Sequence, residues 1–369
     1  MTTQQPAALQ LQEPADLLAV MPHLLGFHPA SSLVAVAFAG ARVVFLARID
    51  LHEPGTPPGE IGTDLAALGK ILMRQTPDMV LLIGYGNPEQ VTPVIGIAEA
   101  VLAGYRVPVG AALRVTGSRY FHCHCTSPEC CPPDGTPFDP ATSTVAAQAV
   151  YAGHVALPDR AARVASLASV TGPAREAMHA ATGRAWDRLE RVADAAASAL
   201  TGSAEPVPEC AALNPSTPEL ASAFGELARG AGEEAVRRTF GQHQDSQPLT
   251  DDDVAWLTLL LQDPVVRDGA WAHTRDAGEH TQIRFWSGVT RRAEPGLVPA
   301  PACLLALAAL HRGDGILAQI ALDQALDADP GYTLALLLSE VIRQGIPPAV
   351  LDALLDGTTD PAPGQPAGH

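Results

Sequence analysis

The apolar pattern of this chain changes near residue 143, and that change most constrains the fold. Before residue 143, short apolar runs of strand length alternate with segments of helical periodicity, which is typical of an α/β sheet. After residue 143, apolar residues recur at helical spacing. We therefore predict an α/β N-terminal domain followed by an all-α C-terminal domain.

The elements expected in the first part are strands at 33–38, 42–50, 79–83, 109–115 and 119–125, and helices at 16–21, 64–74 and 94–103. Pro22 is expected to end the first helix. The Pro- and Gly-rich segment 52–62 is expected to be a loop. Alternating strands and helices predict some parallel pairing, with a hairpin at each end of the sheet.

The expected domains are 1–142, an α/β domain ending in a cysteine-rich loop; 143–240, a helical linker region; 248–357, a helical domain; and 358–369, a disordered tail. Residues 201–218 form a Pro- and Ser-rich break. Helices expected at 302–310 and 316–328 flank the turn His311–Gly315, and their pattern resembles a tetratricopeptide unit. A solenoid needs about three such units, and only one is visible.

Four of the six cysteines lie within a short cluster. The cluster of candidate metal ligands contains His122, Cys123, His124, Cys125, Cys130 and Cys131. Thiolates and imidazoles are the usual zinc ligands, and thiolates are also redox groups. A structural metal site, a disulfide or redox-sensitive pair, a catalytic thiol and plain reduced thiols all remain open interpretations. Structural zinc is the leading one, because a bound metal stabilises a short loop more than a disulfide does.

Strand alternation would place Cys123 and Cys125 on one face and the two histidines on the other. A zinc trio of Cys123, Cys125 and Cys130 is then geometrically reasonable. Adjacent residues such as Cys130 and Cys131 rarely reach one metal together. Candidates for a fourth ligand are Cys131, a histidine of the cluster, His154 and Cys210.

The formal net charge of −17 argues against nucleic acid and against an anionic membrane surface as partners. The first twelve residues lack the pattern of a secretory signal, and no apolar run is long enough for a transmembrane helix. We therefore expect a cytoplasmic protein, in which thiols stay reduced.

No complete catalytic motif occurs: the sequence lacks Gly-x-Ser-x-Gly, His-Glu-x₂-His and a Walker lysine loop. The segment Gly84–Glu89 follows a strand and precedes a helix, where α/β proteins bind phosphate. It has Glu89 where the dinucleotide fingerprint has its third glycine, so an ordinary turn is the better interpretation.

Two motifs together resemble those of a known family. The first is Leu24-Leu25-Gly26-Phe27-His28-Pro29-Ala-Ser-Ser32-Leu33-Val34, which resembles the pattern Leu-Gly-Phe-x-Pro-x-x-Ser-Leu-Val, and the second is Cys125-x₄-Cys130-Cys131-Pro132-x₂-Gly135. They look like signatures of the actinobacterial domain-of-unknown-function family numbered 4192, and the late segment Gly313–Leu326 resembles a third. The resemblance covers about residues 14–355 and implies no substrate or catalytic residue. The chain departs from the family at His122, Cys123 and His124, so the shared thiols are those at 125, 130 and 131.

The leading functional hypothesis is a non-catalytic cytoplasmic protein that binds another protein through its helices, in a regulatory or scaffold role, with a structural cysteine-rich site. The alternative is an enzyme that uses the cluster as a metal-dependent hydrolase or a thiol redox site.

Overall fold

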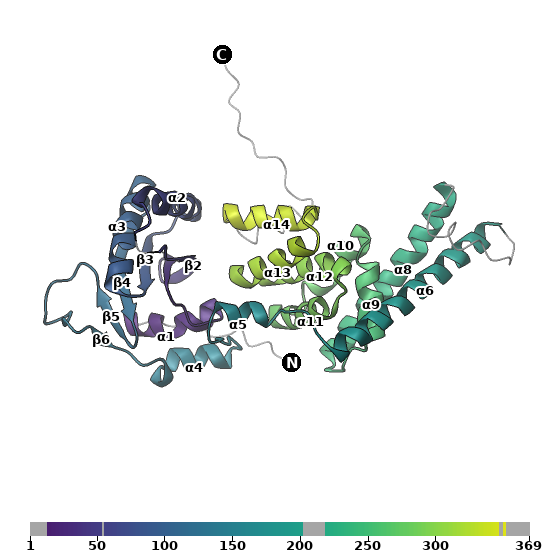
Figure 1. Cartoon of the computed structure of the whole chain (residues 1–369), viewed down its shortest axis with the longest axis horizontal. Helices are drawn as coiled ribbons and strands as arrows, with labels where there is room; N and C mark the ends of the chain where they lie inside the picture. Colours follow the sequence, from purple (N-terminus) through teal and green to yellow (C-terminus); the bar gives the residue numbers. More distant parts are fainter. Residues whose placement is uncertain (1–12, 54, 202–217, 347–349, 352–369) are drawn as a thin grey trace, which may run out of the picture. The chain divides into compact units, whose positions relative to one another are not determined.

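A computed structural model describes residues 13–53, 55–201, 218–346 and 350–351 (Figure 1). The described residues form two compact units: unit 1 within 1–163 and 341–369, and unit 2 within 164–340. The expected break at 201–218 falls almost wholly outside the described residues, as do the tail 358–369 and Cys210. Unit 1 is an α/β structure and unit 2 is helical, which confirms the predicted fold class at this level.

Unit 1 is built on one mixed, six-stranded sheet with the strand order β2-β1-β3-β4-β5-β6. Its strands are β1 (Ser32–Ala39), β2 (Arg42–Asp50), β3 (Met79–Tyr85), β4 (Val109–Thr116), β5 (Arg119–His122) and β6 (Thr136–Pro137). Only the β3–β4 pair is parallel; the other four pairs are antiparallel. Both expected hairpins are present: β1–β2 lies at one end of the sheet, whereas β4–β5 is followed by the short strand β6 at the other end.

The core of unit 1 lies between the sheet and two helices, α2 (Pro58–Gln75) and α3 (Pro88–Gly104). Alternate residues of β1, such as Leu33 and Ala35, pack there with Leu72 of α2 and Ile95 of α3. Val34 and Val36, on the opposite face of β1, are also buried. Burial on both faces explains why β1 is a continuous apolar run instead of an alternating one.

Several helix boundaries differ from the sequence expectation; α3, for example, begins at Pro88 instead of residue 94. Helix α1 (Pro14–Leu25) continues through Pro22 and ends at Gly26, which has φ +77°. Pro22 is itself buried with Met21 and Leu25, so packing of the last turn outweighs the hydrogen bond that proline removes. Helix α2 begins at Pro58, inside the expected loop, because proline is favourable at the first helical position.

Unit 1 also contains α4 (Thr144–Tyr151), the 3₁₀ turn η1 (Pro140–Thr142) and the first residues of α5 (Arg160–Ala165), whose last two residues belong to unit 2. Unit 2 contains α6 (Pro173–Thr201), α8 (Pro218–Gln244), α9 (Asp251–Leu260), α10 (Pro264–Thr274), α11 (Glu279–Arg292), the 3₁₀ turn η2 (Pro295–Leu297), α12 (Pro299–His311) and α13 (Gly315–Ala328). The last helix, α14 (Thr333–Gln344), begins in unit 2. Among the described residues, none of the helices combines the length and apolarity that crossing a bilayer requires.

The helices of unit 2 pack around aromatic and small apolar side chains. Trp256, Trp271 and Trp286 are all buried. Helices α12 and α13 pack against each other across a short turn that ends at Asp314, whose carboxylate accepts from Leu317 N–H. The segment is therefore a helical hairpin.

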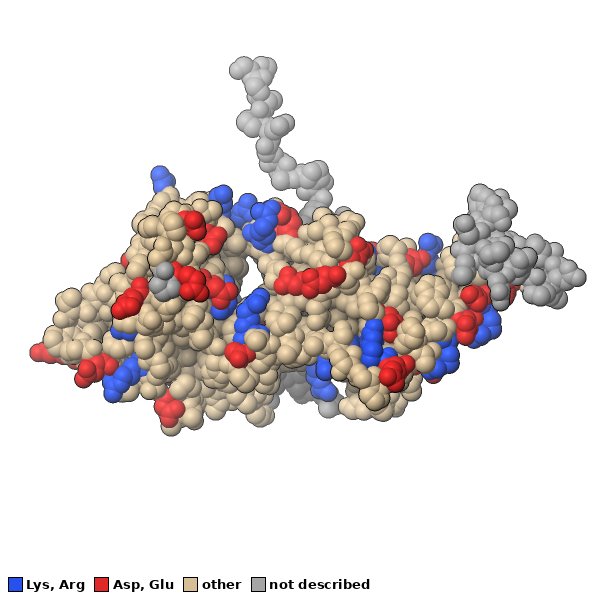
Figure 2. Space-filling model, in the orientation of Figure 1, with Lys and Arg blue, Asp and Glu red and all other residues tan. Residues whose placement is uncertain are grey.

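Several charged side chains in unit 2 form ion pairs between helices. The three aspartates at the start of α9 accept from arginines of other helices: Asp251 from Arg292, Asp252 from Arg184 and Asp253 from Arg238. Asp253 also completes a capping box with Thr250. Figure 2 shows the same interspersion of acidic and basic side chains over the face that it draws.

Candidate metal centre

The thiol cluster lies on the loop that joins β5 to β6. These strands pair Arg119 with Pro137 and Tyr120 with Thr136, so the two ends of the loop are held side by side. Phe138 N–H also donates to Ser118 O (3.0 Å). The loop from 123 to 135 is therefore closed at its base by the sheet.

Arg119 and Gly135 anchor the base of this loop. The Arg119 guanidinium donates to the carbonyl oxygens of Asp134 (3.2 Å) and Gly135 (2.8 Å). Gly135 has φ +77°, and a Cβ built there would lie 2.6 Å from the Phe121 ring. Only glycine fits this position without displacing Phe121. The Phe121 ring also makes a cation–π contact with the Arg114 guanidinium, which lies 3.8 Å from the ring centroid.

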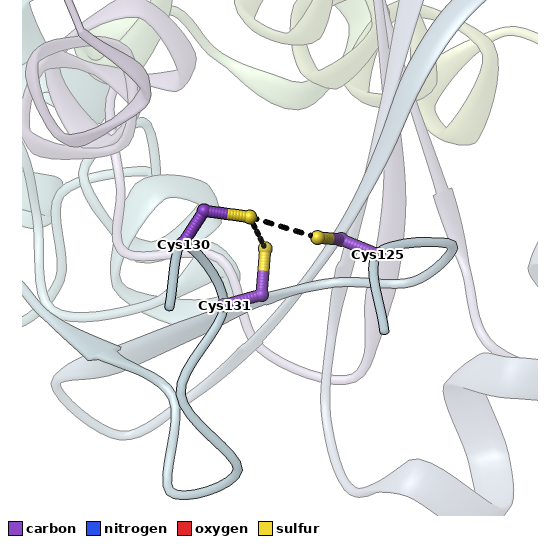
Figure 3. A group of neighbouring side chains, drawn as sticks. All are labelled: Cys125, Cys130 and Cys131. Carbon is purple, nitrogen blue, oxygen red and sulfur yellow. Dashed lines mark hydrogen bonds between the residues drawn. The ribbon is translucent and has the colours of Figure 1, made fainter. Parts of the chain in front are cut away.

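Three thiols of the loop converge (Figure 3). The Cys130 Sγ atom lies 3.0 Å from Cys125 Sγ and 3.4 Å from Cys131 Sγ. All three sulfur atoms lie within 4.8 Å of one another. A turn produces this arrangement, because Cys131 N–H donates to Ser127 O (2.9 Å) and folds Cys130 and Cys131 back toward Cys125.

Cys125 and Cys131 hold their protons unequally. Hydrogen bonds from the thiols of Cys131 and Cys130 lower the pKa of Cys125. The hydrogen bond to Cys125, with smaller contributions from burial and from Cys130, raises the pKa of Cys131 to about 12. The first thiolate is therefore stabilised by its neighbours, whereas a second negative charge beside it is unfavourable. A cation among the three sulfurs would remove that repulsion.

The spacing of the sulfurs suits a shared zinc ion. Sulfurs that each lie about 2.3 Å from a tetrahedral zinc are roughly 3.8 Å apart. The contacts of Cys130 to Cys125 and Cys131 are somewhat shorter than that separation, so an ion would need to push the thiols apart by less than 1 Å. These residues fit the coordination that a zinc or another thiophilic ion requires.

The other members of the predicted cluster lie outside this group. Cys123 is exposed, and its backbone N–H donates to Ala112 O (2.9 Å). Burial of part of the side chain raises the pKa of the Cys123 thiol. His122 lies on β5 with its ring edge against Tyr120, and the His124 Nε2 atom lies 2.6 Å from Glu99 Oε1 of α3. Within the described residues, only Cys125, Cys130 and Cys131 form a group that could hold a metal ion.

The observed trio differs from the one that strand alternation favoured. Strand β5 ends at His122, three residues before the expected end, so Cys123 and Cys125 are not consecutive residues of one strand face. Cys131 joins the group, because the turn after Ser127 directs the adjacent side chains of Cys130 and Cys131 to one point. The side chains of the adjacent cysteines thus converge with Cys125 in the structure.

Sequence reasoning missed the anchors Arg119 and Gly135 and the contact of His124 with Glu99. The segment Pro133-Asp134-Gly135 is a turn signature that could have indicated a left-handed glycine. The contacts of Arg119 and Glu99 join residues far apart in the sequence, and the local pattern gives no signal for them.

The segment Gly84–Glu89 is an ordinary strand-to-helix connection in the structure. A Cβ at Gly84 would lie 2.2 Å from the Val91 side chain, so this glycine allows α3 to pack closely on β3. The Asn87 side chain accepts from Gln90 N–H and caps α3. Packing and capping therefore account for the glycine and the asparagine of this segment.

The chain belongs to a family described as a domain of unknown function (DUF4192), whose model matches residues 14–349. This confirms the family resemblance drawn from the sequence. Neither the curated proteins nor the solved structures include a significant match.

Proposed function

We propose that this member of the DUF4192 family is a non-catalytic, zinc-binding cytoplasmic protein that acts by binding another protein. The convergence of Cys125, Cys130 and Cys131 within 4.8 Å carries the zinc-binding part of the proposal. A reducing compartment would keep these thiols available for the ion.

The position of the thiols favours a structural role for the ion. They lie on a surface loop, and Cys130 is exposed. Three thiolates donate much negative charge to zinc and make it a weak Lewis acid. The nearby imidazole of His124 is held by the Glu99 carboxylate instead of facing the sulfurs. The ion would brace the loop between β5 and β6.

The helical part supports the protein-binding role. The α12–α13 hairpin has the sequence pattern of a tetratricopeptide-like unit, a type of repeat that presents surfaces to partner proteins. Leu336 and Leu337, on α14 immediately after this hairpin, are 49% and 59% exposed. We propose that these apolar side chains contribute to the contact with the partner.

Metal analysis of the untagged full chain tests the zinc site. We expect about one zinc per chain in the wild type and in Cys123→Ser, and less than about 0.2 per chain in Cys125→Ser and Cys131→Ser. Cys123→Ser is the matched control, because Cys123 belongs to the same loop and lies outside the group. Equal zinc content in all four proteins would overturn the proposed ligand set.

A second candidate function follows from the coordination number. The described residues supply three thiolates and no fourth ligand, and an open position is the mark of a catalytic zinc site. Thiol titration distinguishes a zinc site, structural or catalytic, from a thiol redox site. Thiols that hold zinc react only after chelation, whereas a catalytic thiolate reacts at low pH without a chelator. Hydrolase activity would additionally require turnover that depends on added zinc.

A further inference from the structure

A pocket of about 460 Å³ lies in unit 2, where α6 meets the segment that leads into η2. Its lining includes His179, Thr182, Gly183 and Trp186 of α6, and Glu294 and Gly296 of the η2 segment. The four α6 residues fall at positions i, i+3, i+4 and i+7, so they share one face of the helix. None of these residues belongs to the thiol loop.

Trp186 gives the pocket an aromatic wall. Its side chain is 44% exposed, whereas Trp256, Trp271 and Trp286 are buried. An indole in this position offers a π face to a ring or a cation in the pocket.

Glu294 gives the pocket a carboxylate that is only half satisfied. Arg175 donates to Glu294 Oε2 (2.9 Å) and to the Ala293 carbonyl oxygen (3.0 Å), which fixes the carboxylate in place. The second oxygen, Glu294 Oε1, is buried and has no hydrogen-bond partner in the described part of the chain. A buried carboxylate oxygen without a partner is unfavourable, and a ligand with a hydrogen-bond donor would satisfy it.

Thr182 provides a second unpartnered polar atom. The residue is 7% exposed, and among the described residues nothing hydrogen-bonds to its Oγ1 atom. The hydroxyl and the carboxylate oxygen can both accept from the same N–H-rich group.

We propose that this pocket binds a small organic ammonium ion that carries an aromatic ring. The ammonium group donates to Glu294 Oε1 and Thr182 Oγ1, and the ring stacks on Trp186. The His179 Nδ1 atom lies 3.7 Å from Glu294 Oε2, and the His179 side chain is 83% exposed. Because Glu294 Oε1 and Thr182 Oγ1 are buried, this side chain turns aside to admit the ammonium group.

The charge of the site favours a cation over an anion. Within the described residues, neither lysine nor arginine lines the pocket, and the neighbouring Arg175 already donates to two oxygens. The chain as a whole carries a formal net charge of −17. A cation would also make a favourable cation–π contact with the indole face of Trp186, whereas a carboxylate would be repelled by Glu294.

Gly183 provides a variant that fills the pocket without disturbing the fold. A Cβ at Gly183 meets no atom within 4 Å, so a larger side chain there extends into open space. Replacing a helical glycine also raises helix propensity. Gly230→Leu is the matched control, because Gly230 is likewise a helical glycine with open space around it and lies outside the pocket lining.

The test is a titration of the ¹⁵N-labelled full chain, followed by the indole N–H signal of Trp186, which Trp186→Phe identifies. The probes are 2-phenylethylammonium, its neutral isostere 2-phenylethanol and the anion 3-phenylpropionate. We expect the ammonium probe to shift the Trp186 signal saturably, and the two other probes to bind at least about tenfold more weakly. Glu294→Gln should weaken binding of the ammonium probe by about tenfold or more.

Gly183→Leu should abolish the shift, and Gly230→Leu should leave it unchanged. Binding by Gly183→Leu as tight as that of the wild type would overturn the proposal, even if Glu294→Gln failed to fold. Equal affinity for all three probes, or no saturable shift with the ammonium probe, would also overturn it.

Discussion

Two of the clustered thiols, Cys125 and Cys131, differ in their hold on a proton, although they lie on one loop. Cys125 is the thiol whose negative charge is stabilised, because its neighbours donate hydrogen bonds to it. Cys131 is the thiol that keeps its proton, because it donates to Cys125. In the metal-free loop, Cys125 therefore loses its proton more readily than Cys131.

Replacing Cys131 by alanine should therefore raise the pKa of Cys125, since the variant loses the donor that contributes most to lowering it. The measurement is the rate of iodoacetamide alkylation of Cys125 against pH in chelator-treated protein, followed by peptide mass spectrometry. We expect the profile of Cys131→Ala to move to higher pH. Cys123→Ala serves as the control and should leave the profile in place; a shift of the same size in both variants would contradict the assignment.

Zinc affinity should rise with pH. Zinc binds thiolates, so each thiol that is still protonated must release its proton on binding, and the raised pKa of Cys131 keeps that proton in place at neutral pH. We expect affinity to increase by up to about tenfold per pH unit for each proton released, between about pH 6 and 8. Competition with a chromogenic chelator at several pH values measures this. If the zinc affinity did not change over this range, zinc binding would release no proton, and Cys131 would not be a ligand.

At the scale of elements, the β5–β6 hairpin determines whether the thiols meet. The strands close the loop, and Arg119 with Gly135 fixes its base. The sequence predicted a cysteine-rich loop after the last long strand. It could not indicate where β5 ends, because the apolar pattern does not distinguish Phe121-His122 from the two cysteines that follow.

Gly135→Ala should weaken zinc binding. The substitution places a Cβ against Phe121 at a left-handed φ, which costs about 1 to 3 kcal/mol and opposes the closed loop. We expect a loss of zinc affinity of about tenfold, measured by the same chelator competition. Gly96→Ala in α3 is the control, since a Cβ at Gly96 meets no atom within 4 Å. Unchanged affinity in Gly135→Ala would mean that the base of the loop does not position the thiols.

The core between the sheet and α2 should dominate the stability of unit 1. Leu72 is fully buried there, so Leu72→Ala is expected to lower the free energy of unfolding by about 3 kcal/mol. Val44→Ala on β2 is the control, because Val44 is 43% exposed and its loss should cost far less. Urea denaturation followed by far-ultraviolet circular dichroism measures both. Equal effects of the two substitutions would contradict the assigned core.

The ends of helices and strands show which boundaries the local sequence predicts and which it does not. The β2 strand was predicted with its observed bounds, since turn residues and apolar residues mark both of its ends. The end of α1 was not predicted, because the burial of Pro22 and Leu25 is a property of the packed unit. Local signals therefore identify most elements, and tertiary contacts decide their ends.

At the scale of the whole molecule, the change of apolar pattern near residue 143 predicts the fold class. It does not predict which segments of the chain belong to each unit. The segment after residue 340 joins unit 1 through contacts such as that of the Arg74 guanidinium with the Gln344 carbonyl oxygen, 270 positions apart. No local pattern carries information about such a contact. The proposed ammonium pocket was likewise invisible in the sequence, because its two sides are about 110 positions apart.

The thiol loop belongs to unit 1 and the pocket to unit 2, so the two proposals stand on separate residues. Loss of zinc should leave the binding of an ammonium probe to unit 2 unchanged, and filling the pocket should leave zinc content unchanged. The two sites can therefore be tested independently in the full chain.

X-ray absorption spectroscopy of the zinc-loaded, untagged protein is the decisive test of the zinc site at Cys125, Cys130 and Cys131, because it identifies the atoms bound to the metal. We expect three sulfur ligands at about 2.3 Å and one lighter ligand. A coordination shell made only of nitrogen and oxygen, or a shell with no more than one sulfur, would contradict it.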